Sequence, residues 1–387
     1  MSQEHPMKTQ DFLISIVMPC LNEEGAIESC VTKIKNVFDV KHINGEIIIC
    51  DNGSTDNSVA IAKSLGVLVV HEPKRGYGNA YLLGFSAAKG EYLFMADVDG
   101  TYDFNEIPNF LIKLIDEKYD FVTGSRYLKT NKIKSMPFLH RYVGNPALTL
   151  ILNFLFGVKF SDVYSGFRAF KRDVYKRIKP VSPGMEFNLE LAINAKLAGL
   201  RIAEIPITLH ERIGKSKLRT FEDGWRSLRM MLLYCPNKLF IWPGILFFLL
   251  GILIHLVTLF GYIKYEGRPL SNVTGIFGNI FSVIGFAILV FGLQVKTYSW
   301  SRRFNKKDVF LLHFYKIFTL EKGLMIGLII TMAGFLILFN LFFQWLSSDL
   351  MPLPHPEWVS FASTLVIIGS NIIFTSFFIS AMSITKK

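Results

Sequence analysis

The stretch FMADVDGTYD, residues 94–103, ends a short apolar run with the aspartates Asp97, Asp99 and Asp103. Asp97 and Asp99 are separated by one residue, so on a continuing strand both side chains point to the same face. Two carboxylates this close raise each other's pKa unless a positive charge lies between them. They therefore either splay into solvent as a turn or bind a cation. Carboxylate oxygens suit Mg²⁺ or Mn²⁺ better than Zn²⁺.

The region around this stretch, residues 12–125, alternates short β-rich runs with helical stretches. The periodicity predicts strands at 13–19, 46–51, 67–71, 92–97 and 120–125, with helices at 23–38, 57–65, 78–89 and 104–117. Such alternation predicts an α/β fold with a Rossmann-like, mostly parallel sheet that binds ligands at the carboxyl ends of its strands. Polar clusters lie at five of these ends, so we expect them to form one crevice: residues 22–24, 51–56, 75–78, 97–103 and 124–126.

Two of these clusters have the composition of nucleotide-binding turns. DNGSTDNS, residues 51–58, places an acidic residue where it can accept a hydrogen bond from a base or a ribose. KRGYGNA, residues 74–80, combines Lys74 and Arg75 with Gly76 and Gly78, which allow the backbone to approach a phosphate closely. Each motif alone is common as a surface turn or an N-capped turn. Their order and their strand-end positions together indicate a nucleoside diphosphate site.

The second half of the chain is much more apolar than the first. Of the 387 residues 51% are hydrophobic, with a mean hydropathy of +0.35, and the excess lies in four stretches near 239–263, 273–295, 324–345 and 358–384. Each reaches the ~20 residues that a helix needs to cross a bilayer. We expect a soluble domain over 1–217, a juxtamembrane helix over 218–235 and a four-span domain over 236–387.

Two shorter stretches are amphipathic without being long enough to span, residues 138–158 and 218–234. They are either core helices or helices lying in the headgroup plane. We favour the interfacial interpretation, because both carry Arg or Lys near the polar face and the second runs into the first span.

The distribution of Lys and Arg predicts the membrane orientation. The loop between the second and third spans, residues 296–323, is rich in basic residues, and the chain ends in Lys386 and Lys387. The positive-inside rule then places the N-terminal domain, this loop and both termini in the cytoplasm. A bacterial inner membrane is the favoured location. No signal peptide is expected, because the first apolar run has only strand length.

The net charge of +11 fits a membrane surface better than nucleic acid, which we do not expect as a partner. Much of it lies in the basic loop and just before the first span, where it meets anionic headgroups. The four cysteines, Cys20, Cys30, Cys50 and Cys235, form no CxxC pair and are expected to be reduced thiols. A homo-oligomer is compatible with the sequence.

The motifs occur in the order of a known family. SIVMPCLNEE, IIICDNGSTD, RGYGNA, FMADVDGTYD, VTGSRY and DVYSGFRAF resemble the motif series of inverting glycosyltransferases of family 2 with the type-A fold. HERIGKSKL and EDGWRSLRMMLLYCP, just before the membrane domain, resemble the polyprenyl-phosphate glycosyltransferases, such as dolichol-phosphate mannose and glucose synthases and their undecaprenyl-phosphate relatives. The resemblance covers about residues 12–245. It implies transfer of one sugar, expected to be glucose or mannose, from a UDP- or GDP-sugar to a polyprenyl phosphate, with inversion and with Mg²⁺ or Mn²⁺.

The resemblance also implies roles for single residues. Those expected to bind the nucleotide sugar are Pro19, Asn22, Glu23, Asp51, Arg75, Gly76 and Asp97. Asp97 and Asp99 would face the diphosphate and the metal ion, with Asp99 the better candidate for direct ligation. Those expected to bind the acceptor phosphate are Arg126, Arg141, Asn145, Arg212 and Lys217. Asp99, Asp162 and Arg126 are the expected catalytic residues.

Two roles stay open at this point. Asp162 matches a position proposed as a base or as a positioning residue; a phosphomonoester is already ionised near pH 7, so Asp162 alternatively orients Arg126 or Arg141. Glu186 and Glu190 stand one helical turn apart and either contact a sugar hydroxyl or form a solvated face.

Two features bear on the alternatives. Asn52 stands where DDGSTD motifs have a second aspartate, and the chain has no Q-x-x-R-W sequence, the mark of processive polysaccharide synthases. The missing sequence weakens the processive alternative. A catalytically idle domain that serves as a membrane scaffold or binding module is the third alternative, and the presence of Asp97, Asp99 and Arg126 argues against it.

The basic loop gives a topology prediction. A cysteine introduced at Ser301 should resist membrane-impermeant thiol reagents in intact cells and react after the membrane is opened, because the loop is expected in the cytoplasm. The wild-type chain controls for the native cysteines. Efficient labelling from outside would show that the orientation or the number of spans is wrong.

Overall fold

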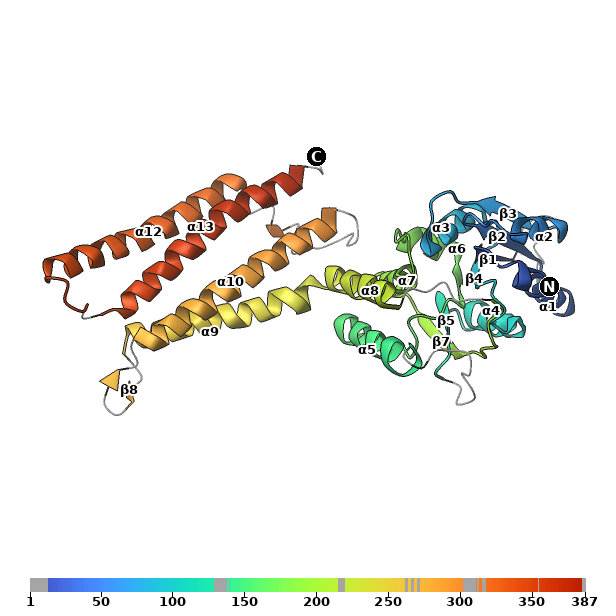
Figure 1. Cartoon of the computed structure of the whole chain (residues 1–387), viewed down its shortest axis with the longest axis horizontal. Coiled ribbons are helices and arrows are strands. Elements are labelled where there is room, and N and C mark those ends of the chain that lie inside the picture. Colours follow the sequence, from blue (N-terminus) through green and yellow to red (C-terminus); the bar gives the residue numbers. More distant parts are fainter. Residues whose placement is uncertain are drawn as a thin grey trace, which may run out of the picture. The chain divides into compact units, whose positions relative to one another are not determined.

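The computed structural model describes residues 13–128, 138, 140–214, 220–261, 264–265, 268–269, 272–301, 311, 313–314, 318–353 and 355–384. The chain divides into two compact units, Met1–Met231 and Leu232–Lys387 (Figure 1). Each unit is described by itself.

The first unit is built on a seven-stranded sheet with the order β3-β2-β1-β4-β6-β5-β7. All neighbouring strands are parallel except β6, which is antiparallel to both β4 and β5. The α/β fold and the five predicted strands are confirmed, whereas β6 and β7 were not predicted. The strands are β1 (Ile14–Cys20), β2 (Gly45–Asp51), β3 (Leu68–His71), β4 (Tyr92–Met95), β5 (Phe121–Ser125), β6 (Arg168–Lys171) and β7 (Ile202–Pro206).

Helices cover both faces of this sheet (Figure 1). The helices that begin in the first unit are α1 (Glu24–Val40), α2 (Ser58–Ser64), α3 (Tyr77–Ala87), η1 (Phe104–Glu106), α4 (Ile107–Ile115), η2 (His140–Gly144), α5 (Asn145–Phe156), α6 (Arg172–Ile178), α7 (Phe187–Leu197) and α8 (Thr220–Tyr234). Side chains alternate along β1, so Ile16 and Met18 enter the core under α1 and α4, while Val17 enters the core under α3 and α7. The result is a three-layer unit with a buried sheet.

An aromatic cluster centred on Phe167 joins the segment before β6 to β4. The Phe167 ring centroid lies 4.8 Å from that of Phe94, 5.0 Å from Phe110 and 4.7 Å from Tyr102. Because Tyr102 belongs to the aspartate-rich loop, this packing holds that loop beside the segment that precedes β6.

The second unit contains η3 (Asn237–Ile241), α9 (Trp242–Leu259), β8 (Lys264–Tyr265), β9 (Arg268–Pro269), α10 (Asn272–Ser301), α12 (Leu320–Ser347) and α13 (Glu357–Ile384). Among the residues that the structure describes, four helical stretches are long and apolar enough to cross a membrane, as predicted, with mean hydropathies of 2.4, 2.3, 2.4 and 1.8. Small residues let them approach closely: a side chain at Gly285 on α10 would lie 2.2 Å from the backbone of Phe248 on α9.

The predicted domain limits at 217 and 235 stay a prediction. The predicted juxtamembrane helix corresponds to α8, and the stretch 138–158 corresponds to η2 followed by α5. Most of the basic loop, including 302–310 and 315–317, lies outside the described residues.

Candidate active site

A cavity of about 460 Å³ opens at the carboxyl ends of β1, β2 and β4. Its lining includes seven of the residues that the sequence predicted for substrate or metal: Pro19, Glu23, Arg75, Gly76, Asp97, Asp99 and Arg212. Four of the five predicted strand-end clusters contribute to this cavity, whereas the cluster at residues 124–126 contributes no residue to its lining.

Asp99 is buried and both of its carboxylate oxygens have partners. Oδ1 accepts hydrogen bonds from the backbone and the hydroxyl of Thr101, at 3.0 and 2.6 Å. Oδ2 lies 2.7 Å from Nη1 of Arg212, which also contacts Glu23 Oε1 at 2.9 Å through Nη2. Arg212 thus supplies the positive charge that the neighbouring carboxylates require.

Asp97 faces tyrosine hydroxyls instead. Tyr77 donates to its Oδ1 at 3.0 Å and Tyr81 at 3.5 Å, both from α3. Burial, and then the negative charge of Asp99, raise the pKa of Asp97 to about 7. The two tyrosines were not among the predicted residues; the motif RGYGNA contains Tyr77 and ends one residue before Tyr81. Their spacing of four residues puts both on one face of α3.

One side of the cavity is formed by the turn after β2. Asn52 lines the cavity, accepts from Gly76 N at 2.7 Å and donates to the carbonyls of Glu72 and Lys74 at 3.0 and 2.9 Å. An aspartate at this position would have no N–H to donate to these carbonyls. Asn52, which replaces the second aspartate of the DDGSTD pattern, therefore joins the turn after β2 to the loop after β3.

Asp51 and Asn22 lie beside this turn and hold it. Asp51 accepts from Ser54 N at 2.9 Å and lies 3.1 Å from Nδ1 of His71, a partner that the sequence did not reveal. Burial alone would raise the pKa of Asp51, but the hydrogen bonds, first from Ser54 and then from His71, lower it below its ordinary value. Asn22 Oδ1 accepts from Thr55 N at 2.7 Å.

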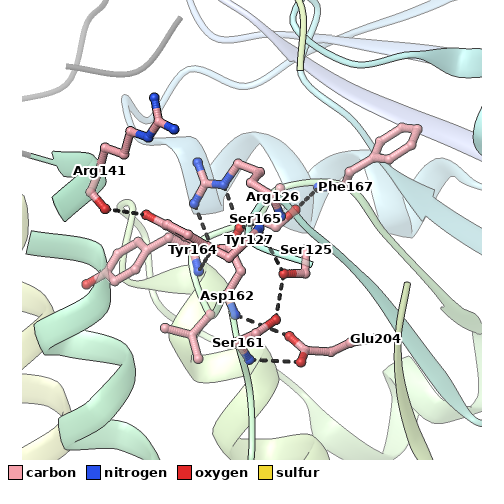
Figure 2. Close-up of polar contacts among 12 residues, drawn as sticks. Ser125, Arg126, Tyr127, Arg141, Ser161, Asp162, Tyr164, Ser165, Phe167 and Glu204 are labelled. Carbon is pink, nitrogen blue, oxygen red and sulfur yellow. Dashed lines mark hydrogen bonds and ion pairs between the residues drawn. The ribbon is translucent and has the colours of Figure 1, made fainter. Parts of the chain in front are cut away.

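A second charged centre lies at the end of β5, where Arg126 and Asp162 form a paired contact (Figure 2). Asp162 accepts from Arg126 Nε at 2.6 Å, from Nη2 at 2.7 Å and from its backbone N at 3.1 Å. Asp162 is fully buried, and the charge and hydrogen bonds of Arg126 outweigh burial and lower its pKa. Its lone pairs are engaged, so this geometry favours orientation of Arg126 over proton abstraction.

Tyr127 connects this centre to η2 and α5. Its hydroxyl donates to the carbonyl oxygen of Arg141 at 3.0 Å (Figure 2), and the Asn145 side chain also hydrogen-bonds to it. The guanidinium of Arg141 lies 5.0 Å from the ring centroid of Tyr142. In Figure 2 the guanidinium groups of Arg126 and Arg141 lie on the same side of this cluster.

The residues predicted for the acceptor phosphate thus fall into two groups. Arg126, Arg141 and Asn145 gather around Tyr127, whereas Arg212 contacts Glu23 and Asp99. Lys217 lies outside the described residues.

For Glu190 the solvated-face interpretation is wrong, and the contact with a sugar hydroxyl stays a prediction. Glu190 is 1% exposed and accepts from the backbone N–H groups of Val181 and Ser182, at 2.9 and 2.7 Å. It therefore holds the loop before Gly184 and Met185, two further residues of the cavity lining. Glu186 accepts from Gly184 N at 3.2 Å.

Comparisons with known proteins identify the class. The pattern described as "Glycosyl transferase family 2" matches residues 15–179, and that described as "Glycosyltransferase family 2 C-terminal transmembrane region" matches residues 293–383. The "Low-salt glycan biosynthesis hexosyltransferase Agl6" of Haloferax volcanii is 37% identical over 95% of this chain and 89% of its own length. The chain belongs to glycosyltransferase family 2 and is an integral membrane glycosyltransferase.

Two further relatives each match more than half of this chain. A "Dolichyl-phosphate hexose transferase" of Haloferax volcanii is 33% identical over 54% of this chain and 89% of its own length. A "UDP-N-acetylglucosamine--dolichyl-phosphate N-acetylglucosaminyltransferase" of Methanococcus voltae is 30% identical over 59% of this chain and 98% of its own length.

The raised pKa of Asp97 predicts a pH-dependent stability of the ligand-free protein. The folded state holds this proton more tightly than the unfolded state, so the contribution of Asp97 is fully present below about pH 4 and is lost as pH rises to about 7. In Asp97→Asn the side chain cannot ionise, so this loss of stability does not occur, and its Oδ1 still accepts from Tyr77. In EDTA at pH 8 we expect the variant to be more stable than wild type by roughly 1–3 kcal/mol, and equally stable near pH 4.

Thermal unfolding across this pH range measures the difference. Asp103→Asn is the matched control, because it removes a carboxylate from the same loop. Asp103 lies outside the cavity lining, and its Oδ1 accepts from Asn105 N at 3.0 Å. Parallel pH curves for Asp97→Asn and wild type would contradict the assignment.

Proposed function

We propose that this glycosyltransferase moves one hexose from a nucleotide-sugar donor to a polyprenyl phosphate, with inversion at the anomeric carbon. One observation carries the proposal: the same unit holds a carboxylate-lined cavity at the ends of β1 and β4 and a separate arginine centre at the end of β5. The printed names of the two shorter relatives, which both contain dolichyl phosphate, support this class of acceptor.

The donor is assigned to the cavity. We assign Asn52 and the turn it holds to the nucleoside, together with Pro19 and Glu23 at the same end of the neighbouring strand β1. Arg75 and Gly76 are placed for the diphosphate. The relatives' names differ in the sugar, hexose in one and N-acetylglucosamine in another, so glucose or mannose from UDP or GDP remains our prediction for this chain.

The residues fit a divalent cation bound together with the diphosphate. Asp97 and Asp99 offer hard oxygen ligands, and Asp99 Oδ2 already binds a cation in the form of Arg212. No group of three or more His, Cys, Asp or Glu side chains able to hold a metal occurs among the described residues, so diphosphate oxygens would complete the coordination. When bound, Mg²⁺ or Mn²⁺ would neutralise charge on the leaving diphosphate.

The acceptor is assigned to Arg126 and Arg141. Arginine holds a phosphate through paired, charge-assisted hydrogen bonds, and Asp162 fixes the Arg126 fork in one orientation. The ionised phosphate attacks the anomeric carbon, a bond forms from its oxygen to that carbon, and the bond to the diphosphate breaks with its electron pair. No proton has to be removed from the acceptor, so alignment supplies most of the acceleration.

The membrane supplies the acceptor at headgroup depth. In the first unit, four apolar side chains in or just before η2 and α5 are strongly exposed: Phe138 75%, Tyr142 55%, Leu150 70% and Phe154 73%. Such a face is typical of a helix that lies in the interface. We place this unit and both termini in the cytoplasm from the Lys and Arg distribution; the bacterial inner membrane stays a prediction.

A transfer assay tests the function. Purified full-length protein is screened with UDP- and GDP-linked glucose, mannose and N-acetylglucosamine plus Mn²⁺, first by thermal shift and then with polyprenyl phosphate. One donor should stabilise the fold and yield a single-sugar lipid product. Asp99→Asn should remain folded and lose both the metal-dependent shift and transfer. Polymer formation would favour a processive synthase, and no transfer with any donor would favour the idle scaffold.

The acceptor assignment predicts the effect of Arg141→Ala. Loss of a charged phosphate contact should lower kcat/KM for polyprenyl phosphate by roughly ten- to a hundred-fold, with little change in donor affinity. Kinetics in detergent at varied acceptor concentration measure it. Arg172→Ala is the control. This exposed arginine is the first residue of α6 and follows Lys171, the β6 residue that pairs with Tyr92, so it lies at the opposite edge of the sheet. An unchanged acceptor KM and kcat for Arg141→Ala would remove the residue from the site.

A further inference from the structure

Two charged side chains from other strands hold the backbone that carries Asp162. Glu204, on β7, accepts from Ser161 N through Oε2 at 2.8 Å and from Asp162 N through Oε1 at 3.2 Å (Figure 2). Arg168, the first residue of β6, donates from Nη2 to the carbonyl oxygen of Val163 at 2.6 Å. Three consecutive residues are thereby fixed from both sides.

This arrangement sets the position of Arg126. Both Asp162 oxygens bind the Arg126 fork, so a shift of the Asp162 backbone would carry the guanidinium with it. The Oγ atoms of Ser161 and Ser125 lie 2.6 Å apart, which ties the same segment to the end of β5 (Figure 2).

Glu204 and Arg168 are charged side chains in surroundings where burial of a charge is costly. Glu204 and Thr123 are partners in the backbone register of β7 and β5. The Arg168 residue is 1% exposed. Burial first, and the nearby Asp162 charge as a smaller cause, raise the pKa of Glu204. Buried charges are often replaceable by apolar residues without loss of stability, so their presence here points to a requirement for geometry.

We propose that Glu204 and Arg168 are positioning residues that act through the Ser161–Val163 backbone and Asp162 to aim Arg126 at the acceptor phosphate. The proposal rests on the proposed function for the nature of the ligand. Neither residue touches the substrate; their effect is on how well Arg126 is aligned before the phosphate arrives.

Glu204→Gln is the decisive variant. It keeps the size of the side chain, but its amide nitrogen cannot accept one of the two backbone N–H groups. Glu46→Gln is the matched control: Glu46 is also a strand glutamate that accepts a backbone N–H, Lys89 N at 2.6 Å, and it lies at the opposite end of the sheet. Both variants are studied as the full chain in detergent.

Two measurements are made on each protein. Hydrogen–deuterium exchange reports the amides of residues 160–165 and 125–127. Titration calorimetry reports binding of citronellyl phosphate, a short isoprenyl phosphate used as the probe. For Glu204→Gln we expect faster exchange in both segments, about ten-fold weaker probe binding and a lower kcat/KM for polyprenyl phosphate, because Arg126 is less well aligned. Glu46→Gln should match wild type in these readouts.

Unchanged exchange in Glu204→Gln overturns the proposal, and so does unchanged probe affinity or an equal loss of affinity in both variants. If wild type itself fails to bind the probe, the acceptor assignment is wrong. The exchange data then still decide whether Glu204 positions Asp162 and Arg126, because they do not depend on any ligand.

Discussion

Three carboxylates converge on one edge of the sheet, and the structure there depends on Arg212. Glu23 follows β1, while Asp97 and Asp99 follow β4, its parallel neighbour, so the topology alone brings them together. Arg212 contacts two of the three at 2.9 and 2.7 Å. To deliver this charge the chain after β7 returns over the aspartate loop, with Ile213 N bonded to Asp99 O at 2.9 Å and His210 N to Thr101 O at 2.8 Å.

The two charged centres differ in how readily they can change partners. The Arg212 side chain is 26% exposed and borders the cavity, so a donor diphosphate with a cation can replace its contacts at a modest cost in solvation. The Arg126 side chain is 12% exposed and its partner Asp162 is not exposed at all. Separating that pair would leave a buried charge uncompensated, which costs several kcal/mol, roughly 3–5. The first centre is suited to exchange, and the second to holding one geometry.

Most of the sheet could be predicted from the sequence because parallel strands are buried on both faces and read as apolar runs. β6 and β7 were not predicted. β6 is short, antiparallel and begins with Arg168, a charged residue normally expected at the surface, and β7 is a five-residue strand that carries Glu204. The grouping of the site residues could also be predicted only in part. Motif order indicated one crevice, but the contact of Arg212 with Asp99 joins positions 113 apart in the chain, and only the path of the loop after β7 determines it. Likewise, a lone acid in the run RIAEIPI gave no signal that Glu204 binds the Asp162 backbone.

One stretch of backbone, Phe160–Arg168, connects the two centres. Near its start Asp162 binds Arg126, and further on Gly166 N donates to the Tyr102 hydroxyl at 3.0 Å. A Cβ at Gly166 would lie 3.0 Å from Asp97 Oδ2 and 2.8 Å from the Tyr77 hydroxyl, so only glycine lets this backbone pass so close to the carboxylate of Asp97. In-line transfer needs the acceptor phosphate and the donor sugar held at a fixed distance and angle. A single segment that touches both the arginine and the aspartate fixes that relation more directly than two independent loops could.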